Sequence, residues 1–187
     1  MENRLANPAP LGLAGFALTT TLLSLINAGL LPAAGMGMVL ACAFAFGGSA
    51  QFVAGYTEFN RGNTFGMTAF CGYGAFWWSF ALFVALFAKD VPAAFVGWYL
   101  LLWGLFTFYL LIASLALNRA VQSVFLALVI TFLLLAAGAF SGAAALTAWG
   151  GYFGLLTAAL AWYLSAAEVI NEAHGRSVLP VGAKRPA

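Results

Sequence analysis

Charged side chains are scarce in this 187-residue chain: Asp, Glu, Lys and Arg together make up 6% of it. A soluble globular domain carries about 25% charged residues, so this class of protein is excluded. Apart from Lys184 and Arg185 the sequence has no run of basic residues, which argues against nucleic acid as a partner. Hydrophobic residues fill 64% of the chain instead, and this composition indicates an integral membrane protein.

Cysteine and histidine are almost absent as well. Cys42 and Cys71 both lie in apolar runs, where we expect small buried side chains and no disulfide framework. The one histidine, His174, lies close to the C-terminus, so a nucleophile such as Ser49 has no conventional base. We therefore expect no enzyme activity, no metal and no cofactor.

The apolar residues form long segments separated by short polar breaks. A hydrocarbon layer of about 30 Å needs about 20 residues per helix. We place six such helices near 8–31, 33–59, 64–88, 92–116, 119–140 and 144–171. The first is longer than the core of a signal peptide, which is about 7 to 15 residues, and we expect it to be retained. The predicted fold class is an all-α integral membrane protein with a single transmembrane domain over residues 1–187.

Basic residues are distributed unevenly between the two sides of these helices. An even number of spans puts both termini and two of the loops on one side, with Arg4, Arg61, Arg119, Arg176, Lys184 and Arg185, while the other side has only Lys89. By the positive-inside rule, we expect a multi-pass protein of the cell (inner) membrane with both termini in the cytoplasm.

Three helices are expected to start on that side, and each follows an asparagine. Asn7, Asn63 and Asn118 are spaced 56 and 55 residues apart, which suggests three helical hairpins in tandem around a central pathway. At the first, Asn7 can cap the helix, while Pro8 and Pro10 remove N–H groups that would lack a partner. The alternative is that asparagine is simply a good cap and that any two-helix unit has this length.

Nine or ten residues beyond each asparagine stand Phe16, Tyr73 and Leu128. Ten helical residues rise about 15 Å, which is half of the hydrocarbon core. If the three helices line one axis, these side chains close an apolar constriction at mid-membrane, of the kind that gates by dewetting. On spacing alone, ordinary core or lipid-facing residues are the default interpretation, since the chain contains 18 phenylalanines.

Polar residues within or at the ends of the spans are candidates for function. Gln51 and Ser49 lie inside the second span, where polar side chains usually face the bundle interior or a wet cavity, so they are candidate substrate contacts. A hydrogen bond between helices is the alternative. Glu58 and Glu168 lie at span ends and are candidates for a proton relay, or for solvated and paired surface carboxylates.

Several longer motifs resemble the acetate uptake transporter family, which includes bacterial succinate–acetate permeases, and the match runs almost end to end. The motifs are N-P-A-P-L-G-L-x-G-F at 7–16, A-Q-x-x-A-G at 50–55, G-N-T-F-G-x-T-A-F at 62–70 with Y-G-x-F-W at 73–77, and E-V-x-N-E-x-x-G-R-x-x-L-P-x-G at 168–182. The match is looser in the fourth and fifth helices and in the loop after the first.

This resemblance implies six-helix protomers assembled as a homohexamer. It implies that each protomer has its own pathway for acetate and other small monocarboxylates and, in some members, succinate. It also implies a central hydrophobic constriction, which falls on Phe16, Tyr73 and Leu128. Ala161 matches a small position near the pathway, where added bulk should alter the preferred substrate size.

For acetate as substrate, we expect hydrogen-bond donors at the mouth and a tight apolar centre. Three helix N-termini with Asn7, Asn63, Thr64 and Asn118 near them would attract the anion. The constriction would strip its water, and the Tyr73 hydroxyl would offer a hydrogen bond there.

Other functions remain open on the sequence. The string Asn7-Pro8-Ala9 suggests a neutral-solute or water channel, although such channels pair two of these strings at the membrane centre and this chain has one at its edge. A membrane scaffold is a further alternative. Glu58 and Glu168 are compatible both with a channel and with a proton-coupled carrier.

Overall fold

The computed structural model describes residues 5–182, and within that range all regular structure is helical. Six helical spans are long and apolar enough to cross a membrane, which confirms the prediction of an all-α membrane protein with six spans. Their elements are α1 (Ala9–Asn27), η1 (Ala33–Gly35), α2 (Met36–Cys42), η2 (Ala43–Gly48), α3 (Ser49–Asn60), α4 (Thr64–Leu82), η3 (Phe83–Phe87), α5 (Ala93–Ser114), α6 (Arg119–Ser141) and α7 (Ala144–His174). The second span is η1 to α3, and η2 within it is a π-helical segment.

Two helix ends differ from the prediction by three residues or more. The first helix ends at Asn27, four residues early, because the chain turns at Gly29, where φ is +73° and the N–H groups of Leu30 and Leu31 both bond to the Leu25 carbonyl. The last helix continues to His174, three residues beyond the predicted end, and stops at Gly175 with φ of +60°. Positive φ is costly for residues other than glycine, and a glycine just past a helix end is a common terminator.

The three asparagines do not behave alike. Asn63 Oδ1 accepts a hydrogen bond from Gly66 N–H at 3.1 Å, and Asn118 Oδ1 accepts one from Val121 N–H at 3.0 Å, so both cap their helices as expected. Asn7 lies one residue outside the cap position of α1, which Pro8 occupies. Its Oδ1 accepts instead from Ala9 N–H at 3.1 Å.

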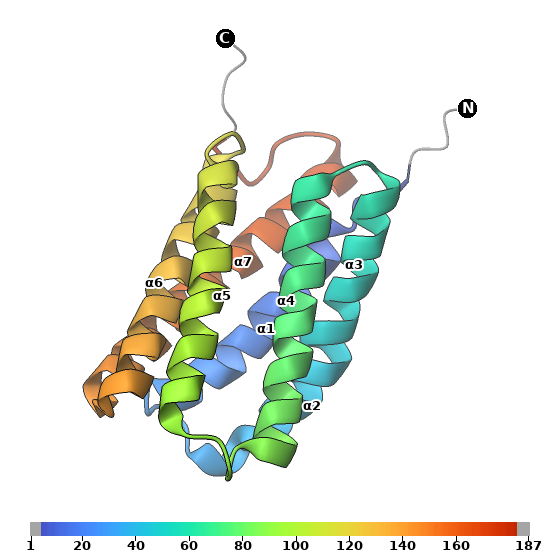
Figure 1. Cartoon of the computed structure of the whole chain (residues 1–187). Helices are drawn as coiled ribbons and strands as arrows, with labels where there is room; N and C mark the ends of the chain where they lie inside the picture. Colours follow the sequence, from blue (N-terminus) through green and yellow to red (C-terminus); the bar gives the residue numbers. More distant parts are fainter. Residues whose placement is uncertain (1–4, 183–187) are drawn as a thin grey trace.

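The spans form a ring (Figure 1). Helix α1 packs between α7 and the α3 span, α7 packs on α6, α6 on α5, and α3 on α4. The ring is completed between α4 and α5 by aromatic side chains, with the Tyr73 and Phe106 rings 5.5 Å apart. The ring therefore joins the first span to the last, and it encloses an interior that side chains from several spans share.

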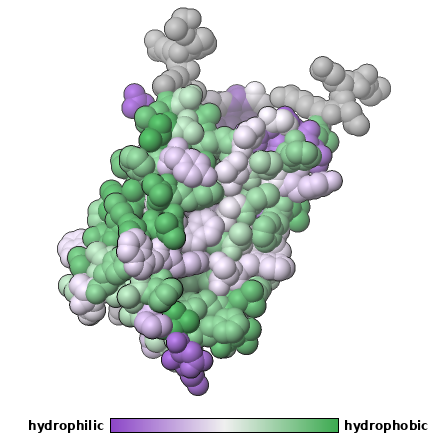
Figure 2. Space-filling model, viewed as in Figure 1, coloured by the Kyte–Doolittle hydropathy of each residue, from purple (hydrophilic) through white to green (hydrophobic). Residues whose placement is uncertain are grey.

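The described chain begins and finishes at the same end of the bundle (Figure 1), and Leu5 and Val181 line one depression there. We call this end the termini side. Arg61 and Arg119 also lie on it, whereas Arg4, Lys184 and Arg185 lie outside the described residues. Figure 2 shows hydrophobic side chains over most of the visible face, with the most hydrophilic ones near its two ends, as a membrane-spanning bundle requires.

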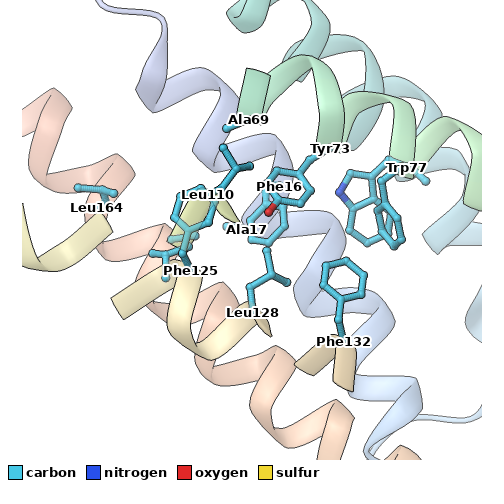
Figure 3. Close-up of a cluster of buried hydrophobic side chains, with 14 of the residues drawn as sticks. Phe16, Ala17, Ala69, Tyr73, Trp77, Leu110, Phe125, Leu128, Phe132 and Leu164 are labelled. Carbon is cyan, nitrogen blue, oxygen red and sulfur yellow. The ribbon is translucent and has the colours of Figure 1, made fainter. Parts of the chain in front are cut away.

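Helix α1 packs closely against η2 beside the centre of the bundle. A Cβ atom on Gly15 would lie 2.6 Å from the Phe46 carbonyl oxygen, so only glycine allows this approach. The neighbouring residue, Phe16, is buried with Tyr73 and Leu128 in the main hydrophobic cluster (Figure 3).

Candidate functional site

A cavity of about 450 Å³ lies inside the ring. Its lining includes most of the residues that the sequence singled out: Asn7, Phe16, Gln51, Asn63, Tyr73, Leu128 and Glu168. Asn7 and Glu168 also line the depression on the termini side, so this is where the cavity has its mouth. The lining changes from polar at the mouth to apolar at the bundle centre.

Three spans contribute the apolar end of the cavity. Phe16 from α1, Tyr73 from α4 and Leu128 from α6 lie beside one another (Figure 3), and each is at most 5% exposed. The centroids of the Phe16 and Tyr73 rings are 5.7 Å apart. Phe125 joins them, with its ring 6.3 Å from that of Tyr73. The sequence reasoning missed Phe125, although its place three residues before Leu128 puts it on the same helix face.

The Tyr73 hydroxyl is already bonded within the protein. It donates to Thr107 Oγ1 at 3.0 Å, and the Thr107 hydroxyl donates to the Trp103 carbonyl at 2.7 Å. Any hydrogen bond that Tyr73 offers a substrate in this arrangement is therefore one that its oxygen accepts. Thr107 was not singled out from the sequence, because one threonine in the apolar helix α5 carries no distinguishing pattern.

Gln51 and Ser49 have different surroundings. Gln51 is 1% exposed and lines the cavity, and its Oε1 has no hydrogen-bond partner among the described residues. Ser49 does not line the cavity; its hydroxyl donates to the Phe44 carbonyl at 2.6 Å, within the π-helical part of the span. The structure thus brings Gln51 into the cavity and leaves Ser49 bonded to its own helix.

Charged and amide groups meet at the mouth. Glu58 is 3% exposed, accepts a 2.9 Å hydrogen bond from Asn63 Nδ2 and lies 3.8 Å from Arg61 Nε. Arg61 Nη1 also donates to the carbonyls of Leu5 and Ala6, at 3.2 and 2.6 Å. The guanidinium thus holds both a buried carboxylate and the segment before α1.

The start of α6, at the mouth, carries fewer available N–H groups than expected. At α6, Arg119 N–H donates to the Gly182 carbonyl and Ala120 N–H to the Val181 carbonyl, both at 3.1 Å. The next N–H group, that of Val121, donates to Asn118 Oδ1. The predicted attraction of an anion to this helix end is corrected, because the C-terminal segment satisfies the donors that the anion would need.

Two other predicted residues lie outside the cavity lining. Thr64 is exposed at the start of α4. Ala161 is 0% exposed and belongs to the same hydrophobic cluster as Phe16, Tyr73 and Leu128. A larger side chain at position 161 would have to displace members of this cluster.

Six apolar spans arranged around an internal cavity define a multi-pass α-helical membrane protein. Comparison with known proteins identifies its family: the chain belongs to the GPR1/FUN34/yaaH family, which it matches over residues 1–183. This confirms the membership inferred from the four motifs.

Relatives cover nearly the whole chain. The succinate-acetate/proton symporter SatP of Escherichia coli strain K12 is 47% identical over 185 residues, covering 97% of each chain. Acetate permease A of Emericella nidulans is 38% identical over 197 residues, covering 95% of this chain and 66% of the relative. The solved structure of the bacterial acetate channel SatP superimposes with a TM-score of 0.92 at 44% identity, covering 96% of this chain and 100% of the other. These relatives carry the names of transporters or channels and not of enzymes.

Proposed function

We propose that this protein carries acetate and related small carboxylates across the membrane, through the cavity and the constriction formed by Phe16, Tyr73 and Leu128. The observation that carries this proposal is the change of lining along one cavity, from amides and charges at the mouth to an apolar end of three side chains. Transport by relatives that are 38% to 47% identical supports the substrate class.

In this proposal, the substrate enters at the mouth and loses its water in two stages. Asn7 and Asn63 carry amide groups there, and Gln51 replaces part of the water shell deeper in the cavity. The constriction then removes the rest, which limits passage to a solute with a small apolar part, such as the methyl group of acetate. Succinate is the larger substrate that tests this limit.

The proposal places the protein in the cell (inner) membrane, with the termini side in the cytoplasm. Its support is the excess of basic residues on that side, including Arg61, Arg119 and Arg176. Accessibility of a single introduced cysteine, Ser177→Cys, to an impermeant thiol reagent in intact cells tests this topology, with Cys42 and Cys71 replaced by alanine. Labelling of this cysteine from outside the cell would contradict a cytoplasmic termini side.

We further propose that the protomers assemble as a homohexamer, each with its own pathway. The support is the family resemblance described above. Native mass spectrometry of the detergent-purified protein tests the subunit number directly, and a monomer or a different ring size would contradict it.

Labelled-acetate uptake into proteoliposomes tests the transport function. Protein-free liposomes measure the leak through lipid, and a pH gradient and a membrane potential are imposed separately. Uptake that tracks the pH gradient and can run uphill would reject a simple anion channel, whereas downhill flux driven only by potential would reject obligatory proton coupling. Stopped-flow water permeability in the same vesicles tests the alternative of a neutral-solute channel.

A further inference from the structure

The hydrogen bonds that link Tyr73, Thr107 and Trp103 have a fixed donor and acceptor at each step. The Trp103 carbonyl can only accept, so the single proton of the Thr107 hydroxyl is committed to it at 2.7 Å. Thr107 Oγ1 can then only accept in its 3.0 Å contact with Tyr73, and the Tyr73 hydroxyl must donate its proton to Thr107. Thr107 is 0% exposed, so water does not compete for these bonds.

This arrangement decides what Tyr73 can offer a solute. With its proton held by Thr107, the phenolic oxygen keeps only its lone pairs, and it accepts hydrogen bonds without donating any. The other side chains of the constriction, Phe16 and Leu128, are hydrocarbon. Trp77, which has an indole N–H without a partner among the described residues, lies one helical turn further along α4 and outside the cavity lining.

A carboxylate and a carboxylic acid differ in the hydrogen bonds that they can form with an acceptor in an apolar constriction. A carboxylate only accepts hydrogen bonds, so it gains nothing from an acceptor and still loses its water. The neutral acid carries one O–H group that can donate to the Tyr73 oxygen. We propose that Thr107 is a positioning residue, which fixes the Tyr73 hydroxyl as an acceptor and so makes the constriction select the protonated acid over the carboxylate.

Gln51 supports this inference independently. Its Oε1 is buried without a partner and lines the same cavity. A carboxamide matches a carboxylic acid in both donor and acceptor, whereas a carboxylate uses only the amide N–H and leaves Oε1 unsatisfied. The unpartnered oxygen therefore also favours a solute that brings a donor.

The proton balance involves only the solute and water. A carboxylate takes a proton from water at the mouth, forming the acid O–H bond, crosses as the neutral acid, and releases the proton to water on the other side. This inference rests on the proposed transport function. It requires one proton for each carboxyl group, so acetate flux is electroneutral and succinate carries two protons.

The test compares wild-type protein with Thr107→Val and Thr107→Ser in proteoliposomes, after subtraction of the lipid leak. For the wild type, flux at constant total acetate should fall about 10-fold per pH unit above the acetate pKa, and that of succinate about 100-fold above both of its pKa values. Neither flux should respond to an imposed membrane potential. In Thr107→Val the Tyr73 proton is released toward the cavity, so acetate flux at high pH should rise about 10-fold and follow the potential; Thr107→Ser should restore the wild-type behaviour.

Ionisable side chains near Tyr73 require a control. Glu58, Arg61 and Glu168 line the same cavity, and Tyr99 and Tyr109 lie on the neighbouring helix α5. Glu58→Gln and Glu168→Gln are therefore measured in parallel. If the dependence of acetate flux on pH persists in both variants, it reflects protonation of the solute. If it disappears in either variant, it reflects titration of that protein side chain, and the inference is overturned.

Two outcomes separate this inference from the proposed function. No acetate flux above the protein-free leak would defeat the transport proposal itself. Wild-type flux that is driven by potential and independent of pH would leave transport intact and overturn the selection of the acid, as would a Thr107→Val protein that behaves like the wild type. If Thr107→Val does not fold or transport, the Tyr73→Phe variant is the deciding test of the inference. Its flux of the neutral acid should be several-fold lower because the phenolic oxygen that accepts the hydrogen bond is gone. An unchanged flux would overturn the inference.

Discussion

The side-chain amide of Asn7 donates a 2.5 Å hydrogen bond to Glu168 Oε2, although 161 positions separate the two residues in the sequence. The bond joins the start of α1 to the last turns of α7 at the cavity mouth. The two ends of the described chain thus both contribute to the cavity mouth.

Replacing Glu168 by alanine should loosen this contact. A hydrogen bond to a charged group contributes about 1.5–3 kcal/mol, and solvent at the half-buried mouth reduces this to about 1 kcal/mol. We expect a correspondingly lower free energy of unfolding in detergent and slower acetate flux. Glu172→Ala, on an exposed residue one turn further along α7, is the control, and equal effects of the two substitutions would argue against a specific role for Glu168.

Gln51→Leu should separate stability from function. The buried Oε1 lacks a partner, and an unsatisfied buried polar atom costs about 1–3 kcal/mol. We expect the leucine variant to unfold at the same or a higher temperature, while its acetate flux falls because the solute loses its hydrogen-bonding site. Unfolding at a lower temperature with normal flux would show that Gln51 serves the packing of the bundle instead.

Leu128→Ala should widen the constriction. We expect the flux of butyrate relative to acetate to rise about 10-fold or more, since a few methylene groups in an apolar site control selectivity by this amount. Loss of a buried leucine side chain also lowers the free energy of unfolding by about 2–5 kcal/mol. Leu126→Ala on the exposed face of α6 is the matched control. Unchanged selectivity in folded Leu128→Ala would remove this residue from the pathway.

Ala161→Phe should have the opposite effect. Position 161 is fully buried beside the constriction, so the added ring must push on the cluster that contains Phe16 and Leu128. We expect succinate flux to fall more than acetate flux, by about 10-fold. Ala166→Phe makes the same change on the exposed face of α7 and should leave the ratio of the two fluxes unaltered.

Gly182→Ala should detach the C-terminal segment from α6. Gly182 has φ of +65°, and a Cβ atom there would lie 2.7 Å from Arg119 Cβ. Gly175 also has positive φ, at +60°, but nothing lies within 4 Å of its added Cβ, so Gly175→Ala isolates the backbone cost of about 1 kcal/mol. Limited proteolysis should cleave the segment faster in Gly182→Ala than in Gly175→Ala, and equal rates would contradict the clash.

Most of the fold followed from the sequence, because hydrophobic length is a local property. Six spans were predicted, and their limits agree with the structure to within a few residues. The largest errors fell at Asn27 and His174, where the backbone turns at glycines with positive φ that composition alone does not reveal. The π-helical segment before Ser49 was also missed, since it depends on how α1 packs against this span.

The candidate site could be predicted from the sequence only in part. The sequence by itself determined the apolar spans, their number and the position of Phe16, Tyr73 and Leu128 along their helices, since each depends on residue count and hydrophobicity along one helix. Only the tertiary structure decided that these three side chains meet, that the α6 end is covered by the C-terminal segment, and that Thr107 takes the Tyr73 proton. These relations join residues from different helices, and they depend on packing angles and hydrogen-bond directions that a linear pattern does not contain.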